Sequence, residues 1–144
     1  MAEQNYSNHR RFVAGYHFVL SIVVLLAVAG SLVQLYRAWA MGENRVTSLI
    51  LVLLAIAAAL LFWYCRAFPL KAQDRAIRAE ERLRHYVLTG EMPDARLSTR
   101  QFIGLRFAAD EEFPALAKRA AEEGLSEDAI KKAVRNWRAD TYRV

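Results

Sequence analysis

The chain has 144 residues, a length that suits one soluble domain and decides no structural class by itself. Hydrophobic residues make up 55% of it, above the roughly 45 to 50% of soluble domains, yet 24% is charged and the formal net charge is +5. The single cysteine, Cys65, excludes an intrachain disulfide and a cysteine-based metal site within one chain. Between residues 12 and 65 the only charged side chains are Arg37, Glu43 and Arg45. This segregation predicts a membrane half and an aqueous half.

Two uncharged runs follow a polar N-terminal tail at residues 1–11. The runs at 12–36 and 46–65 each reach the about 20 residues that cross a hydrocarbon core. Their connection at 37–45 is short, so we expect two antiparallel transmembrane helices, a helical hairpin. A cleaved signal peptide is the alternative for the first run, but that run is longer than the about 15 apolar residues of such a signal.

The flanking basic residues predict the orientation of the hairpin, because positive residues resist export. Arg10 and Arg11 precede the first run, and only Arg37 and Arg45 lie in the loop. The basic residues that follow the second run are Arg66, Lys71, Arg75 and Arg78. We therefore expect both termini in the cytosol and contacts of these residues with anionic lipid headgroups. No basic-aromatic binding motif occurs elsewhere, so we expect no nucleic-acid partner.

Small residues four apart let membrane helices approach closely. Ala27 and Ser31 form such a pair in the first span, and Ala55 and Ala59 form one in the second. They predict either packing within the hairpin or docking of a partner helix. His17 is the one imidazole within a span. It lies near the start of that span, which suits an interfacial histidine, and the alternative is a ligand to a haem or pigment.

An amphipathic juxtamembrane helix is predicted at 66–90, ending at Thr89-Gly90. Pro69 would bend the chain or lie in the first turn of this helix. Its apolar residues recur at three- or four-residue spacing: Ala72, Ala76, Ala79, Leu83 and Val87. Asp74 with Arg78 and Glu80 with Arg84 can pair across one turn. This helix could pack on the remaining tail, lie along the headgroups, or associate with its copy in a second chain.

Residues 91–144 are expected to form a small cytosolic domain of short helices. Ser98 with Gln101 matches a capping box, Asp110 would cap a helix that stops at Gly124, and Ser126 would cap a last helix that ends near Trp137. The expected core is Phe102, Ile103, Leu105, Phe107, Phe113, Leu116, Leu125, Ile130, Val134 and Trp137. So small a core is marginal, so we expect the domain to rely on other parts of the chain, the membrane or another chain.

Four stretches of the chain resemble a known bacterial family. They are Gln4 to Val13, Gln73 to Tyr86, Leu105 to Glu112 and Lys131 to Trp137. Together with the layout of two spans, they resemble DUF6526, a domain of unknown function, over essentially the whole chain. The resemblance implies a bacterial membrane protein and implies no activity, substrate or site.

The sequence therefore predicts an all-α protein with a two-helix transmembrane hairpin in the bacterial inner membrane. No phosphate loop, metalloprotease helix or catalytic triad order is present, so we expect no enzyme, metal site or cofactor. We expect an accessory or assembly subunit of a larger complex, whose partners are the bilayer and other membrane subunits or its own copies. The expected interaction residues are Ala27, Ser31, Ala55, Ala59, Arg66, Lys71, Arg75, Arg78, Trp137, Arg138, Tyr142 and Arg143. The alternative is a photosynthetic or electron-transfer subunit that binds pigment or haem through His17.

Overall fold

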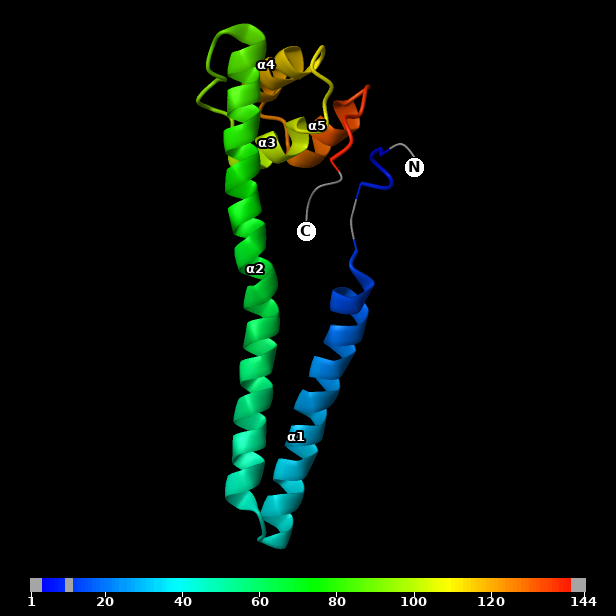
Figure 1. Ribbon diagram of the computed structural model, residues 1–144, viewed down its shortest axis with the longest axis vertical. Coiled ribbons are helices and arrows are strands. Elements are labelled where there is room, and N and C mark those ends of the chain that lie inside the picture. Colours follow the sequence, from blue (N-terminus) through cyan, green and yellow to red (C-terminus); the bar gives the residue numbers. More distant parts are fainter. Residues whose placement is uncertain (1–3, 10–11, 141–144) are drawn as a thin grey trace. The chain divides into compact units, whose positions relative to one another are not determined.

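The computed structural model describes residues 4–9 and 12–140, and every regular element among them is helical (Figure 1). The order is a π-helix η1 (Gly15–Leu20), α1 (Ser21–Met41), α2 (Arg45–Thr89), α3 (Thr99–Leu105), α4 (Phe113–Glu123) and α5 (Glu127–Ala133). The all-α prediction is confirmed. The chain divides into two compact units, which we call the apolar unit (12–68) and the terminal unit (1–11 and 69–144). The helix α2 contributes to both.

The two long helices are apolar enough to cross a membrane over Gly15–Met41 and Arg45–Thr89. Few side chains in their most apolar windows are buried, and many are exposed, including Leu25 at 68% and Leu61 at 63%. The first helix continues to Met41, past the expected end at residue 36, and Gly42 with a φ of 78° closes it. The added turn carries the amphipathic residue Trp39, and the Arg45 guanidinium lies 5.2 Å from the centre of its ring.

Contacts of Tyr16 join the start of the first span to the end of the second within the apolar unit. The Tyr16 hydroxyl donates a hydrogen bond to the Phe62 carbonyl, and the two rings stack with centroids 4.7 Å apart. The Arg66 guanidinium lies 5.9 Å from the centre of the Tyr16 ring. Two antiparallel helices would make such contacts. That they form a hairpin within a membrane stays a prediction.

Small residues are the buried ones in this unit. Among its described residues, only Ser31, Ala38, Ser48 and Ala55 are buried. The Ser31 hydroxyl donates to the Val28 carbonyl at 2.8 Å, which satisfies it within its own helix. Of the other two small residues that the sequence pairs, Ala59 is half-buried and Ala27 is exposed. These positions favour packing within the chain for Ser31 and Ala55, as expected of small residues at a helix contact.

Pro69 lies inside α2, which runs from Arg45 to Thr89 without the break that the sequence analysis places there. Proline has no N–H to donate to the Cys65 carbonyl, so this turn lacks one helical hydrogen bond. Alanine, leucine and lysine, all strong helix formers, flank it at Ala67, Leu70 and Lys71. Their propensity accounts for a helix that continues through the proline. The helix ends as predicted, with Gly90 at a φ of 76°.

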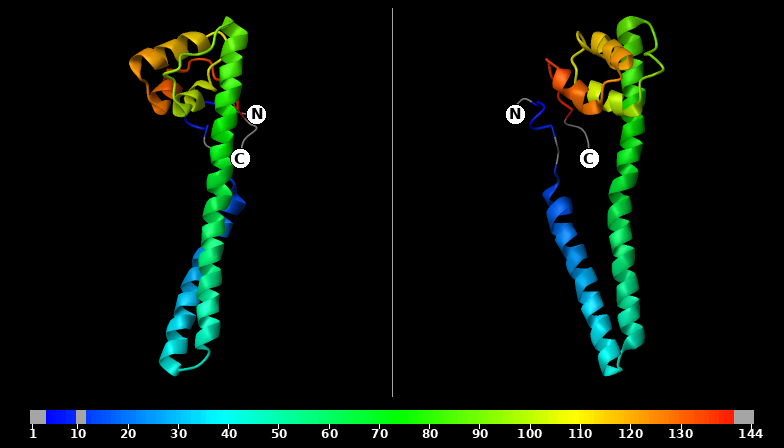
Figure 2. Two further views of the ribbon diagram at one scale, coloured as in Figure 1. Left: turned by 90° about the vertical axis from the view of Figure 1, so that its left-hand side faces the viewer. Right: turned by 180° about the vertical axis from the view of Figure 1, so that it is seen from behind.

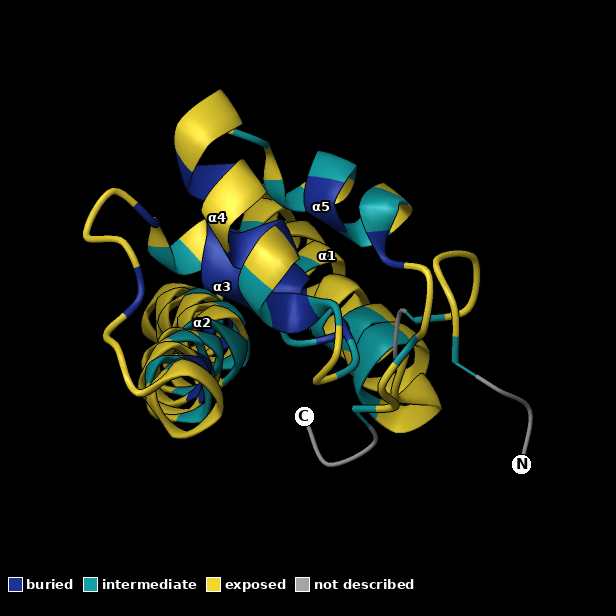
Figure 3. Cartoon of the chain, turned by 90° about the horizontal axis from the view of Figure 1, so that it is seen from above, coloured by how far each residue is buried: buried dark blue, intermediate teal, exposed yellow. Residues whose placement is uncertain are grey.

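The core of the terminal unit lies among α3, α4 and α5, whose buried residues face one another (Figure 3). Figure 2 shows these helices grouped beside the last turns of α2. The predicted core residues Phe102, Leu105, Phe107, Phe113 and Ile130 are all almost fully buried. Ile103, Leu116 and Val134 are buried as well, and Leu125 and Trp137 are partly buried against this core. The sequence analysis missed Ala108, Ala117, Ala120 and Ala121, whose short side chains carry little hydrophobic signal. It also missed Leu97, which lies outside the helices, before α3.

Three predicted helix ends are confirmed. Ser98 and Gln101 form the full capping box, the Ser126 hydroxyl accepts from Ala129 N at 3.1 Å, and Gly124 closes α4 with a φ of 63°. Gln101 has a second role that the motif does not predict. Its buried side-chain amide donates to the carbonyls of Ala120 at 2.8 Å and Leu125 at 3.1 Å, which ties α3 to the end of α4.

Two predicted ends are wrong. The residue before α4 is Glu112, which makes no side-chain capping bond, and Asp110 lies outside that helix and pairs with Arg84. The helix α5 ends at Ala133, not near Trp137, because the backbone becomes extended at Val134 with a ψ of 124°. Trp137 forms an isolated antiparallel bridge with Ala108, so the chain after α5 follows the connection between α3 and α4.

The Gly104→Ala substitution should destabilise the terminal unit, because α3 and α5 cross closely at this glycine. An added Cβ would lie 3.0 Å from the Glu127 carbonyl oxygen and 3.1 Å from the Ile130 Cβ. We expect a loss of about 1–3 kcal/mol in the free energy of unfolding of the full chain in detergent, measured with denaturant. Gly30→Ala is the matched control, because its Cβ would meet nothing within 4 Å. Equal stability of both variants would contradict this packing.

Candidate functional site: the junction of the terminal unit

Four segments that are distant in sequence meet within the terminal unit. They are residues 4–9, 73–86 of α2, 105–112 after α3, and 131–140 at the end of the chain. We call their meeting place the junction. These segments are largely those on which the resemblance to a family rests, so the junction is the candidate functional site. Its geometry depends on two arginines, Arg84 and Arg106.

Arg84 connects α2 to the residues between α3 and α4. Its Nη1 lies 3.0 Å from a Glu81 carboxylate oxygen, and its Nη2 lies 2.6 Å from an Asp110 carboxylate oxygen. Nη2 also donates to the Ala108 carbonyl at 2.7 Å, and the guanidinium lies 4.4 Å from the centre of the Phe113 ring. The guanidinium therefore holds the segment between α3 and α4 against α2 through its N–H groups and one of its faces.

The predicted pairing of Arg84 with Glu80 is therefore wrong. The carboxylate one turn away that Arg84 uses is that of Glu81, which shares the covered side of α2 with Ile77. Residues three and four apart on a helix can both reach an arginine, so spacing does not choose between Glu80 and Glu81. Burial against the short helices decides which carboxylate is within reach.

Glu81 is a buried carboxyl group, only 6% exposed. Burial raises its pKa from the ordinary value of 4.5, and the hydrogen bond and charge of Arg84 oppose this rise. The charge of Arg138 opposes it further. Since desolvation dominates, the folded state binds a proton at Glu81 more tightly than the unfolded chain does.

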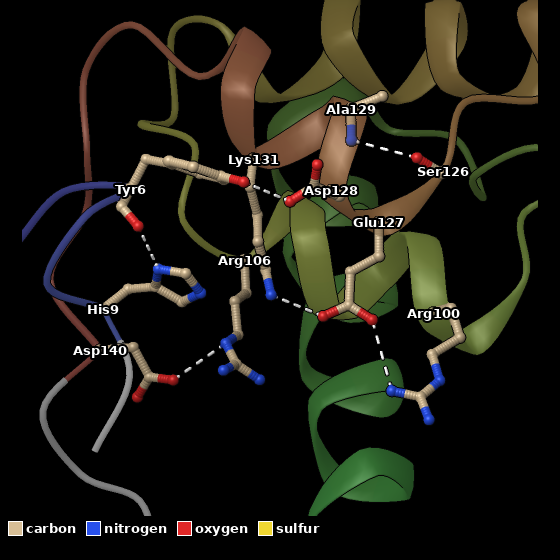
Figure 4. Close-up of polar contacts among 10 residues, drawn as sticks. All are labelled: Tyr6, His9, Arg100, Arg106, Ser126, Glu127, Asp128, Ala129, Lys131 and Asp140. Atoms are coloured by element: carbon tan, nitrogen blue, oxygen red, sulfur yellow. Dashed lines mark hydrogen bonds and ion pairs between the residues drawn. The ribbon is translucent and has the colours of Figure 1, made fainter. Parts of the chain in front are cut away.

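Arg106 forms a further ion pair of the junction, with its Nε 3.0 Å from an Asp140 carboxylate oxygen (Figure 4). Its guanidinium lies 4.6 Å from the centre of the Phe107 ring, and only 9% of the side chain is exposed. The backbone N–H of Arg138 donates to the Phe107 carbonyl at 2.7 Å. Together these contacts fix the last described residues of the chain against the end of α3.

The N-terminal residues close the junction from another side. The Tyr6 hydroxyl donates to an Asp128 carboxylate oxygen at 2.6 Å, and the Asp140 N–H donates to the Gln4 side chain at 2.7 Å. The His9 ring packs against both Phe107 and Trp137, with centroids 5.7 and 5.9 Å away. Figure 4 shows Tyr6 and His9 beside Asp128 and Asp140. The chain before the first span thus packs on the chain after the second.

A polar pocket of about 220 Å³ opens at the junction. Its charged lining consists of Glu80, Glu81, Arg106, Arg138 and Asp140. Both signs of charge are present, so the pocket suits a polar or charged side chain of a binding partner. Within the described ranges, no three His, Cys, Asp or Glu residues form a group that could hold a metal ion.

The structure separates the predicted site residues. Trp137 and Arg138 lie in the junction, whereas Lys71, Arg75 and Arg78 are exposed on α2. His17 lies in the π-helix, where its Nδ1 is 3.0 Å from the Val13 carbonyl oxygen and its ring packs on Phe12 and Tyr16. Arg66 lies over the Tyr16 ring. Tyr142 and Arg143 lie outside the described residues.

Sequence reasoning missed Gln4, Tyr6, Glu81, Arg84, Arg106 and Asp140 as functional candidates. Each is an ordinary polar residue in a charged stretch, and no local motif distinguishes it from a solvated surface residue. One signal was available. Three of the four junction segments, and most of the fourth, lie in the stretches of sequence that resemble a family.

The raised pKa of Glu81 predicts a pH-dependent stability difference between wild type and Glu81→Gln. A native state that binds the proton more tightly loses stability as pH rises from 4.5 through the higher folded pKa. The stability of wild type relative to the variant should therefore fall as pH rises through this window. The measurement is denaturant unfolding of the full chain in detergent, followed by Trp137 fluorescence with Trp39 and Trp63 replaced by Phe. A relative stability that rises with pH would contradict the dominance of burial over the Arg84 pair.

Comparison with known proteins agrees with the resemblance seen in the sequence. No curated protein matches the chain, and no solved structure matches it. The model of a family of unknown function, DUF6526, matches residues 1–144, which is the full length of the sequence. The match covers both long apolar helices and all four segments of the junction. The chain therefore belongs to the DUF6526 family of unknown function.

Proposed function

We propose that this protein is a non-catalytic two-pass protein of the bacterial inner membrane that serves as an accessory or assembly subunit of a larger complex. The observation that carries the proposal is the packing of residues 4–9 on the helical domain at 91–140. This packing forms a binding surface from both ends of the chain, outside the two apolar runs.

Membrane insertion is supported by the side chains of the two long helices. Large apolar residues are exposed along both of them, including Leu25, Leu26, Leu54 and Trp63. Exposed apolar surface costs about 25 cal/mol per Å² in water, so helices of this kind need apolar surroundings. Each helix is long enough to cross the hydrocarbon core of a bilayer.

The proposed orientation is supported by the hydrogen bonds between the ends of the chain. Gln4 and Asp140 can pair only if both termini are on the same side of the membrane. The basic residues that follow the second span, from Arg66 to Arg78, then favour the cytosol for that side. The turn at 42–44 would lie on the opposite side.

A binding role is supported by which charged groups of the junction are already paired within the chain and which are exposed. Arg84 and Arg106 are engaged with carboxylates of the same chain, so they position the segments. Arg138 is exposed and lines the 220 Å³ pocket together with Glu80. Arginine and tryptophan are frequent anchors of protein interfaces, and Trp137 precedes Arg138. The pocket rim is therefore the proposed contact with a partner subunit.

Cysteine labelling tests the proposed topology. In a Cys65→Ser background, we expect Glu43→Cys to react with an impermeant maleimide in intact spheroplasts, because Glu43 lies in the turn between the spans. Ser7→Cys and Arg100→Cys, both exposed in the terminal unit, should react only after lysis. Labelling of Ser7→Cys in intact spheroplasts would contradict a cytosolic N-terminus.

Affinity purification from native membranes in mild detergent tests the accessory role. We expect other membrane subunits to copurify in stoichiometric amounts, identified by mass spectrometry. Arg138→Ala should lower their recovery at least about threefold, in line with the loss of an interface arginine. Arg100→Ala, an exposed arginine on α3 away from the pocket, should not. Recovery of the chain without partners would contradict the proposal, and visible absorption of the eluate that is lost in His17→Ala would favour a pigment or haem subunit.

A further inference from the structure

We propose that the uncovered face of α2 between residues 72 and 87 binds the same face of a second copy of this chain, as a parallel two-stranded coiled coil. This inference goes beyond the accessory role and rests on the membrane insertion and single orientation proposed above. The face consists of Ala72, Ala76, Ala79, Leu83, Tyr86 and Val87. We call it the outer face.

The short helices cover only one side of the last turns of α2. Ile77 and Glu81 lie on the covered face and are 7% and 6% exposed. On the opposite side, Leu83 is 64% exposed, Tyr86 51% and Val87 73%. An apolar surface of this kind, continuous over several turns, is typical of a protein contact.

The spacing of the outer face matches a coiled coil. From Ala72 the apolar positions advance by four, three, four and three residues, through Ala76, Ala79 and Leu83 to Tyr86. This is the heptad spacing of residues that line the seam between two helices. The three alanines allow the two backbones to approach closely, and Leu83 and Tyr86 supply the larger apolar contact.

The charges beside the outer face favour a second copy in parallel orientation. In the heptad register above, Arg75 occupies position g and Glu80 occupies the following position e. In a parallel pair these positions face each other across the seam, so each Arg75 would meet Glu80 of the other copy. Both side chains are exposed, and neither forms an ion pair within residues 4–9 and 12–140. One sequence therefore supplies both partners of two symmetric pairs.

A shallow apolar pocket of about 380 Å³ lies along the outer face. It is lined by Ala79, Leu83 and Tyr86 of the seam, with Arg82 and Met92 at its edge. Met92 is 64% exposed and belongs to the connection between α2 and α3. A large side chain from a facing helix, such as the Leu83 or Tyr86 of a second copy, would fill this space.

Insertion in a membrane would give the two copies the same orientation and bring them close together. All copies inserted in one orientation have parallel α2 helices, which is the arrangement that the charges require. A seam of about two heptads would be weak between free helices in water. Copies held in one bilayer meet at a much higher effective concentration, so a weak seam can still hold a dimer.

Disulfide crosslinking in native membranes tests the dimer. In a Cys65→Ser background, single cysteines at Ala72, Ala79 and Tyr86 should each give a product of twice the chain mass. Crosslinking at both ends of the seam requires a parallel, in-register pair, because an antiparallel pair brings only central positions together. Arg78→Cys is the control, since Arg78 is equally exposed but lies off the outer face. Products of another mass would assign the face to a different protein, and equal or absent crosslinking at all four positions would likewise overturn the proposal.

Charge reversal tests the register independently. Arg75→Glu or Glu80→Arg should lower crosslinking at Ala79→Cys about fivefold, since each places two like-charged pairs across the seam. The double reversal should restore crosslinking. If the single variants had simply failed to fold, the double variant would not recover it. Unchanged crosslinking in the single variants would overturn the assigned register. If topology labelling succeeds and crosslinking fails, the dimer is wrong while the proposed membrane insertion stands.

Discussion

The junction depends on Arg84, because this one side chain joins α2 to the segment between α3 and α4 through carboxylates, a backbone carbonyl and an aromatic ring. Its guanidinium bonds a carboxylate of its own helix, a carboxylate and a carbonyl of the following segment, and the face of a phenylalanine ring. A buried charge is costly without partners, so Glu81 and Arg84 stabilise the structure only while both are in place. The orientation of the short helices on α2 follows from that requirement.

A second constraint is the small size of the helical domain. Its buried core cluster combines large side chains, such as Phe102, Phe113 and Ile130, with several alanines. Residues from outside the domain complete it: Ile77 and Glu81 of α2 on one side, and Tyr6 and His9 on the other. Because the N-terminal segment comes before the first apolar run, the domain is complete only when both ends of the chain meet.

The continuity of α2 gives its last turns two different neighbours. One side faces the short helices with Ile77, Glu81 and Arg84, and the other presents alanines with Leu83 and Tyr86. An apolar helix face is stable in water only when it is covered. The junction covers the first side, and the outer face is left for a partner.

The sequence by itself determined where the chain is helical and several of the helix ends. The runs free of charge, the capping box at Ser98, and the glycine stops at Gly90 and Gly124 are local signals, and each is confirmed because helix formation and capping depend on neighbouring residues. Only the tertiary structure decided which carboxylate pairs with Arg84 and that Asp110 is no cap. Those choices depend on burial and on residues distant in the chain, such as Tyr6 beside Asp128, which local spacing does not contain.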